Sequence, residues 1–257
     1  MKKVFAKVLG ITLAATSLFS IASCGGSSSD EKVLKIGFTY YEPMNYIDET
    51  TKEFVGFDTE FATKVCNELG YKAEFVEIDW NKKVIDLQVG TIDCIWNGMT
   101  ITEELQENIL ISDAYMENKQ VVVVRTADID KYSTVADLAN AKSITYEAGG
   151  AAAGLIEENA ALANVTKNTV TAQVDTLIEV KTSASDVAVI DYTMAKTMTG
   201  EGTDYADLTF IEVDFPVEEY GIGFRKADTE LCNKINAKIA QYKTDGTFDA
   251  WLVKYFI

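Results

Sequence analysis

The stretch "GFDTEFATKVCNELGYKAEFVEI" at residues 56–78 contains an amphipathic helix followed by a strand. Apolar residues recur three and four positions apart, which predicts the helix, at Phe57, Phe61, Ala62, Val65, Cys66 and Leu69. Asp58 suits the N-cap and Gly70 the C-cap. Residues 71–78 read as a strand, and "VLKIGFT" at residues 33–39 alternates like one. Strand, helix and strand in this order are typical of an α/β fold.

The same alternation continues through the rest of the chain. Helices are predicted at 81–90, 133–141, 151–160, 192–198 and 230–256, with strand-like runs at 92–100, 120–125, 143–150 and 186–191. This order predicts an α/β fold with mainly parallel sheets. Ligands bind such sheets at the carboxyl ends of strands. Three strand ends are polar or rich in glycine, namely "WNGMT" after Ile95, "EAGGAA" after Tyr146 and "IDYTM" at Asp191.

Composition excludes several classes of function. The 257 residues include 40 acidic and 23 basic side chains and no histidine, for a net charge of −17. A chain this acidic repels nucleic acid, so we expect no nucleic-acid partner. Without histidine, Ser-His-Asp and Cys-His catalysis are impossible and a zinc site is improbable. Beyond Cys24 the cysteines are Cys66, Cys94 and Cys232, an odd number that favours buried free thiols over a disulfide framework.

The N-terminus has the pattern of an export signal. A basic start is followed by a short apolar run and by small residues that end at Cys24. "IASC" at residues 21–24 resembles the lipobox of bacterial lipoproteins, which implies a signal peptide at 1–23 and lipidation of Cys24. An ordinary cleavage site with an incidental cysteine is the alternative. Residues 24–31 are then a Gly/Ser tether, and no later segment is apolar for long enough to span a membrane.

Several segments in a fixed order carry a resemblance to one family. They are "LKIGFTYYEPMNY", "GFDTEFATKVCNELG", "GTIDCIWNGMTIT", "SDAYMENKQVVVV", "VAVIDYTMA", "EEYGIGFRKADTEL" and "DGTFDAWLVKY". From about residue 32 to 257 the chain resembles the solute-binding proteins of polar amino acid ABC transporters. The resemblance implies a two-lobed type II periplasmic-binding-protein fold whose lobes close on a ligand. One lobe would comprise 32–118 and 216–257 and the other 119–215, with hinge crossovers near 115–119 and 215–219.

The resemblance also implies the positions of a ligand site. Tyr41 and Trp80 match the aromatic residues that sandwich the ligand. Gly98 and Thr100 match the loop that supplies a backbone carbonyl and a hydroxyl. Asp191 matches the aspartate that takes the α-ammonium group. Without the resemblance, the two aromatics would be read as core residues. Asp191 would then be the N-cap of the helix at 192–198.

Two positions depart from the family pattern. "GMTITEEL" places Leu105 where the family has an arginine that binds the α-carboxylate, and "EAGGAA" places Gly150 where the family has a Ser or Thr hydroxyl. Leucine cannot replace a bidentate Arg–carboxylate pair. Leu105 therefore indicates a ligand without an α-carboxylate, a loop rearranged around core packing, or a loss of binding. Asn97 and Glu147 are weaker candidate contacts, and two carboxylates in one cleft would favour a cation.

Together these features predict a lipid-anchored substrate-binding protein of an ABC importer. It would be exported to the outer face of the cytoplasmic membrane or the periplasm, bind a small polar solute with an ammonium group, and pass it to a membrane permease. We expect a monomer without catalytic residues, cofactor or metal. Cation–π contact with Tyr41 and Trp80, together with Asp191, suits such a ligand. The alternatives are a sensor without a transport role and an enzyme on the same fold, such as a cyclic-acid dehydratase.

Overall fold

The computed structural model describes residues 32–257, so the predicted signal peptide, the tether and Cys24 lie outside the described residues. The strands are β1 Lys32–Phe38, β2 Tyr46–Ile47, β3 Phe54–Val55, β4 Tyr71–Glu77, β5 Cys94–Thr100, β6 Leu110–Ile111, β7 Met116–Arg125, β8 Ser143–Glu147, β9 Thr166–Val170, β10 Val187–Asp191, β11 Leu208–Ile211 and β12 Val217–Phe224. The α-helices are α1 Phe57–Leu69, α2 Lys83–Val89, α3 Glu103–Asn108, α4 Ala151–Glu157, α5 Asp175–Lys181, α6 Tyr192–Met198, α7 Thr229–Thr244 and α8 Thr247–Phe256. Short 3-10 helices occupy Trp80–Lys82, Thr126–Lys131, Val135–Asn140 and Ala160–Leu162.

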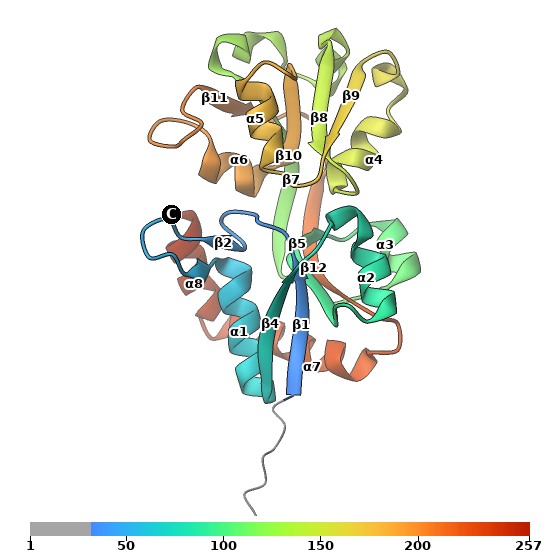
Figure 1. Ribbon diagram of the computed structural model, residues 1–257, viewed down its shortest axis with the longest axis vertical. Coiled ribbons are helices and arrows are strands. Elements are labelled where there is room, and N and C mark those ends of the chain that lie inside the picture. Colours follow the sequence, from blue (N-terminus) through green and yellow to red (C-terminus); the bar gives the residue numbers. More distant parts are fainter. Residues whose placement is uncertain (1–31) are drawn as a thin grey trace, which may run out of the picture. The chain divides into compact units, whose positions relative to one another are not determined.

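One sheet runs through both halves of the described chain in the order β4-β1-β5-β12-β7-β10-β8-β9. The strands β4, β1 and β5 are parallel to one another, as are β10, β8 and β9. Figure 1 shows these two groups, each with its own helices, joined by β7 and β12. We call the group that contains β1 the first lobe and the group that contains β8 the second lobe.

The two joining strands run in opposite directions. β7 and β12 pair antiparallel, with Val217 opposite Lys119 and Tyr220 opposite Met116. β12 continues antiparallel to β5, and β7 continues antiparallel to β10. The prediction of mainly parallel sheets therefore applies to the centre of each lobe and not to the joining strands, because one strand enters the second lobe and the other leaves it. The residue limits predicted for the lobes stay a prediction.

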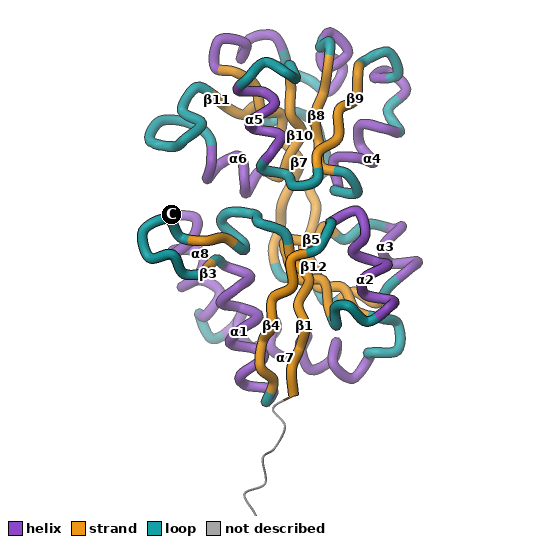
Figure 2. Tube along the Cα trace, viewed as in Figure 1, coloured by secondary structure: helices purple, strands orange, loops and turns teal. Residues whose placement is uncertain are grey.

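Helices cover both faces of the sheet, and the strands are buried accordingly. In β7, Val121 and Val123 pack on the face covered by α5 and α6, whereas Val122 and Val124 pack on the face of α4. Successive side chains of a strand point to opposite faces, so a run of valines suits a strand buried on both sides. In the first lobe, the ring of Phe61 in α1 lies 4.7 Å from that of Trp96 in β5. Figure 2 distinguishes the helical layers from the strands.

Three local predictions differ from the structure. The helix predicted at 230–256 is two helices, since Gly246 adopts φ 84° between α7 and α8. The segment predicted as a helix at 133–141 forms a 3-10 helix, opened by a capping box of Thr134 and Asp137. The N-cap of α1 is Gly56 and not Asp58, which is fully buried within the first turn. Gly70 is the C-cap, as predicted, in the left-handed conformation.

Two further predictions concern cysteines and membrane segments. Cys66, Cys94 and Cys232 are buried free thiols, as expected. Burial raises the pKa of the Cys66 thiol to about 12, which makes it unreactive at neutral pH. Of the helices in residues 32–257, none has the length and apolar character needed to cross a membrane.

Candidate ligand-binding site

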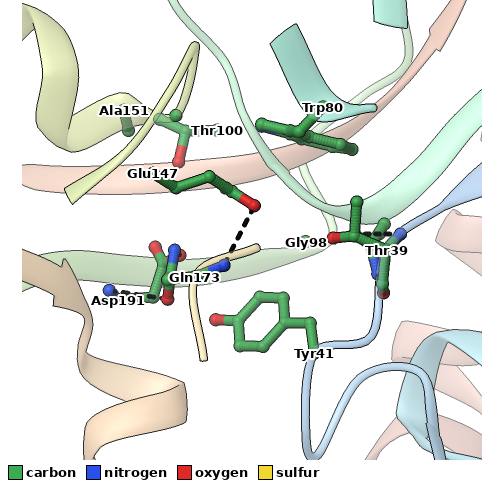
Figure 3. Close-up of a pocket in the computed structure, with 11 residues that line it drawn as sticks. Thr39, Tyr41, Trp80, Gly98, Thr100, Glu147, Ala151, Gln173 and Asp191 are labelled. Atoms are coloured by element: carbon green, nitrogen blue, oxygen red, sulfur yellow. Dashed lines mark hydrogen bonds between the residues drawn. The ribbon is translucent and has the colours of Figure 1, made fainter. Parts of the chain in front are cut away.

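A small pocket lies where the lobes meet. Both lobes supply its lining, which consists of Thr39, Tyr41, Trp80, Asn97, Gly98, Thr100, Glu147, Gly150, Ala151, Gln173 and Asp191. The structure thus brings together eight of the nine predicted contact residues, all except Leu105. Figure 3 shows the carboxyl group of Glu147 pointing between Trp80 and Tyr41. Among the described residues that line the pocket there is no lysine or arginine.

Asp191 ends β10 and lines the pocket with 6% of its surface exposed. It occupies the N-cap position of α6, yet its side chain caps no backbone amide. Its carboxylate instead accepts hydrogen bonds from Asn118 Nδ2, from Gln120 Nε2 at 2.8 Å and from Gln173 Nε2 at 2.6 Å. Burial raises the pKa of this carboxyl, and the amide donors oppose the rise. Neutral donors leave its charge unpaired, so a cationic ligand would be stabilised there.

The partners of Asp191 come largely from the joining strands. Asn118 and Gln120 lie on β7, and Gln120 Nε2 also donates to Glu218 Oε2 on β12 at 3.0 Å. Glu218 accepts a second hydrogen bond at 3.1 Å from the hydroxyl of Thr100, a pocket residue. Burial and the nearby Asp191 raise the pKa of Glu218. A network of amides thus holds two carboxyl groups at the junction of the lobes.

A chain of hydroxyl groups links Tyr41 to the same network. The hydroxyl groups of Tyr41 and Tyr220 are 2.7 Å apart, and that of Tyr220 is 3.0 Å from Thr193 Oγ1. Thr193 donates in turn to Asn118 Oδ1 at 2.8 Å. Tyr41 is therefore a pocket residue and also a buried, hydrogen-bonded one, so its ring is held in a fixed position.

Gly98 turns the chain at the pocket with φ 57°, which suits glycine. A Cβ at this position would lie 2.8 Å from Cε1 of Tyr41. The backbone N–H of Gly98 donates to Asp58 Oδ2 at 2.7 Å, and Tyr115 donates to the same oxygen at 2.9 Å. Burial raises the pKa of Asp58 to about 7. The buried Asp58, predicted as a helix cap, therefore positions Gly98 of β5 instead.

Asn97 lines the pocket, but its side chain is already fully hydrogen-bonded. Its Nδ2 donates to Thr39 O at 2.9 Å and to Asn45 Oδ1 at 2.7 Å. Its Oδ1 accepts from the backbone N–H of Thr39 at 3.0 Å and from the Thr39 hydroxyl at 2.9 Å. An amide side chain has two donor hydrogens and two acceptor lone pairs, so none remains for a ligand. Asn97 ties β5 to the loop after β1.

Glu147 ends β8 and has 5% of its surface exposed. Its Oε1 accepts a hydrogen bond from the backbone N–H of Gln173 at 3.1 Å, whereas Oε2 has no hydrogen-bond partner among the described residues. Burial, and then the charge of Asp191, raise the pKa of Glu147 to about 8, and Lys83 acts in the opposite direction. Gly150 lies beside this carboxyl, since a Cβ there would be 3.3 Å from Oε2.

The segment that begins with Trp80 contacts the second lobe through Asn81 and Lys83. Lys83 lies with Nζ 4.9 Å from the centre of the Trp80 ring, and that Nζ donates to Gly149 O of the second lobe at 2.7 Å. Burial lowers the pKa of Lys83 to about 8. Gly149 has φ 71°, and a Cβ there would lie 2.8 Å from Oδ1 of Asn81. The two lobes therefore approach closely at this glycine.

Leu105 is the predicted site residue that the structure does not bring into the pocket. It lies in the first turn of α3, where its N–H donates to the hydroxyl of the N-cap Thr102 at 3.2 Å. Its side chain packs against an apolar cluster of the first lobe that includes Leu87, Ile95 and Met99. This arrangement favours the core-packing interpretation of Leu105 and leaves the pocket without an arginine.

Sequence reasoning missed three lining residues, namely Thr39, Ala151 and Gln173. Thr39 follows β1, and Gln173 follows β9, so both lie at carboxyl ends of parallel strands. The sequence could have indicated both residues, because ligands bind parallel sheets at the carboxyl ends of their strands. The polar pairs Asn118 with Gln120 and Glu218 with Tyr220 also share a spacing of two, which places each pair on one face of its strand. Residues 32–257 contain no group of three or more acidic or cysteine side chains arranged to hold a metal ion.

The model of the bacterial extracellular solute-binding proteins, family 3, matches residues 34–257. The chain belongs to this family. The predicted family and the predicted two-lobed α/β fold are therefore confirmed. As a member of this extracellular family, the solute-binding protein is exported.

Relatives of this solute-binding protein bind different amino acids. The arginine-binding extracellular protein ArtP of Bacillus subtilis is 28% identical, over 97% of this chain and 98% of its own. The ABC transporter glutamine-binding protein GlnH of Bacillus subtilis is 28% identical, over 97% and 95%. An ABC uptake transporter substrate-binding protein from Streptococcus pneumoniae with bound histidine is 30% identical, with a TM-score of 0.79 over 88% of this chain and 93% of that one.

Proposed function

We propose that this solute-binding protein is a lipid-anchored component of an ABC importer and captures a small polar solute through an ammonium group. Membership of the family supports the general role, since its named relatives are amino-acid-binding proteins. The single observation that carries the finer proposal is Asp191, a buried carboxylate in the pocket whose three hydrogen-bond donors are all neutral amides. A ligand ammonium would supply the missing positive charge.

The absence of a cation among the described lining residues supports a ligand without an α-carboxylate. Burying an unpaired carboxylate is far more costly than burying a neutral polar group. Leu105 and Gly150 offer neither a charge nor a hydroxyl to such a group. Tyr41 and Trp80 line the pocket instead, and the faces of aromatic rings attract cations.

Binding rather than chemistry is the proposed mechanism. The lobes close around the solute by bending at β7 and β12, and the closed form docks on a membrane permease. The lining offers carboxyl, amide, hydroxyl and aromatic groups. Turnover of a candidate substrate by the purified protein would favour the dehydratase alternative, and a partnership with a receptor instead of a permease would favour a sensor.

A thermal-shift screen of the purified mature protein tests the proposal. The panel contains amino acids, amines, betaines and small peptides, and calorimetry then measures each hit. A ligand at 100 times its dissociation constant adds roughly 2.7 kcal/mol, which raises the melting temperature by a few degrees. We expect the hits to carry an ammonium group.

The Asp191→Asn variant tests whether Asp191 binds the ammonium group of each hit. We expect it to weaken binding of each amine by about 1.5–3 kcal/mol, the range for hydrogen bonds to charged groups. Asp204→Asn is the matched control, because Asp204 is an exposed acid of the second lobe. The proposal fails if the panel yields only ligands without an ammonium group, or if the Asp191→Asn protein binds amines as tightly as the wild type.

A further inference from the structure

Two separate carboxyl groups face the same small pocket. Asp191 lies on β10 and Glu147 on the neighbouring strand β8. Gln173 bridges them, since its side-chain Nε2 donates to Asp191 Oδ2 at 2.6 Å while its backbone N–H donates to Glu147 Oε1 at 3.1 Å. The two acids are thus separate acceptors, held by different groups of one glutamine, and each can receive its own ligand group.

The neighbouring cation forms no ion pair or hydrogen bond with Glu147. Lys83 is the basic residue whose charge lowers the pKa of this carboxyl. Its Nζ donates instead to the carbonyl oxygens of Gly149 at 2.7 Å and Trp80 at 3.3 Å, and Lys83 is not a lining residue. Glu147 Oε2 therefore remains an acceptor without a hydrogen-bond partner among the described residues. Figure 3 shows this carboxyl group directed into the pocket.

The local backbone leaves space for this carboxyl. Gly150 begins the turn into α4, and its missing side chain lies next to Glu147, because a Cβ would meet Glu147 O and Oε2 at 3.3 Å each. A larger residue at 150 would press on the carboxylate. The glycine therefore leaves room for the glutamate, which, when ionised, makes this corner of the pocket an acceptor of positive charge.

We infer that the ligand carries two positively charged groups, one held by Asp191 and the other by Glu147, with no carboxylate between them. This inference rests on the proposed capture of an ammonium-bearing solute and adds the second charge. Linear diamines and guanidino-amines have this chemistry. A zwitterionic amino acid would place its carboxylate in a pocket whose described lining contains two acids and no base.

Calorimetry with matched probes distinguishes the effect of the second positive charge on affinity from the effect of the carboxylate. Three pairs differ only by a carboxylate: 1,4-diaminobutane and L-ornithine, 1,5-diaminopentane and L-lysine, agmatine and L-arginine. Butylamine and pentylamine match the two diamines but lack the second charge. In at least one pair, we expect the decarboxylated member to bind at least tenfold tighter than its amino acid. We also expect a diamine to bind at least tenfold tighter than its monoamine.

Glu147→Gln tests whether Glu147 binds the second positively charged group of the ligand. It keeps the size and the accepting oxygen but removes the charge, so the affinity for the diamine or guanidino-amine should fall at least tenfold and that for the monoamine less than twofold. Glu158→Gln is the control, because Glu158 is an exposed acid that follows α4. Circular dichroism and melting temperature verify that each variant is folded.

The outcomes distinguish this inference from the proposed function. If monoamines or amino acids bind tightly and depend on Asp191, but a second charge adds nothing, the inference is wrong and the proposed function stands. Equal losses for diamine and monoamine in the Glu147→Gln protein also overturn the inference. If none of the probes binds at 1 mM, the inference is overturned, and the wider solute screen then decides the proposed function.

Discussion

The ammonium group of Lys83 in the first lobe donates a hydrogen bond of 2.7 Å to the carbonyl oxygen of Gly149 in the second lobe. The same nitrogen lies over the ring of Trp80, and the Lys83 side chain is almost entirely buried. This contact exists only when the two lobes are together, so it stabilises the closed arrangement. Lys83 is not part of the described lining of the pocket, and its effect on binding is therefore separable from ligand contact.

Lys83→Met should weaken ligand binding chiefly by speeding release. Methionine keeps much of the apolar stem but cannot donate to Gly149, so the closed form loses one charged hydrogen bond of about 1.5–3 kcal/mol. Stopped-flow fluorescence should show a dissociation rate raised roughly 10-fold or more, with little change in the association rate. Lys82→Met is the control, since Lys82 is exposed and pairs with Asp79. A slower association with unchanged release would contradict this role.

Glu147 should make the stability of the ligand-free protein fall as pH rises. Its pKa is raised to about 8, against about 4.3 for an unfolded glutamate. Between these values the native state binds more protons than the unfolded state, so the free energy of unfolding decreases with increasing pH. The contribution of the protonated form is fully present below the unfolded pKa and is lost as the pH rises through the folded one.

Urea unfolding at several pH values between about 5 and 8, the window that these two pKa values define, measures this effect. Glu147→Gln should become more stable relative to the wild type at each higher pH, because glutamine has no charge to bury. Asp58, whose pKa of about 7 is also raised by burial, remains in both proteins and cancels from the comparison. A stability difference that does not change with pH would show that Glu147 is ionised throughout.

Creating an amino acid site should require three changes. Leu105→Arg supplies a cation from the first turn of α3, and Gly150→Ser supplies a hydroxyl. The new serine side chain would nevertheless press against the Glu147 carboxyl, because a Cβ there lies 3.3 Å from Oε2. The double variant should therefore bind L-glutamine no better than the wild type, and adding Glu147→Gln should improve binding at least tenfold.

Calorimetry of the wild type, the double variant and the triple variant with L-glutamine and L-arginine measures whether the third change is needed for amino acid binding. Unfolding curves show whether Leu105→Arg disturbs the apolar cluster on which the leucine packs. Tight binding of either amino acid by the wild type would mean that another group, such as backbone amides near Gly150, already takes the carboxylate.

Cys24→Ala should separate the protein from the membrane. The lipobox-like "IASC" predicts a diacyl group on Cys24, so the wild type should sediment with membranes and be released by detergent. The Cys24→Ala protein should be soluble or remain unprocessed. Mass spectrometry of the mature N-terminus is the measurement, and a soluble wild type that begins at another residue would show that the prediction is wrong.

The strand ends were predictable because their chemistry is local. The segments "WNGMT", "EAGG" and "IDYTM" were predicted as ligand positions, and the structure places Gly98, Glu147 and Asp191 at one pocket, although β5 continues through "WNGMT" to Thr100. Periodicity likewise predicted α1, and a helical segment was predicted at 133–141, where the structure has a 3-10 helix at Val135–Asn140. These features depend on neighbours a few residues away.

What the sequence could not predict depends on partners far along the chain. Asp58 resembles a helix cap until its contact with Gly98 of β5, 40 residues away, is known. Asn97 resembles a ligand contact until Thr39 and Asn45 are seen to use all its donors and acceptors. Leu105 resembles a changed specificity residue, but its side chain packs in the first lobe. Partners 40 to 58 residues away decide the first two cases, whereas Leu105 packs on nearer neighbours.

The strands that join the lobes also carry the groups that hold Asp191. Asn118 and Gln120 lie on β7, and Tyr220 and Glu218 on β12 extend the same network. Bending of these strands must therefore shift the amides around the carboxylate, and a ligand that pulls on Asp191 must pull on the strands. Substitutions that adapt this network to a new ligand would consequently alter how readily the protein opens, even where every residue that touches the ligand is unchanged.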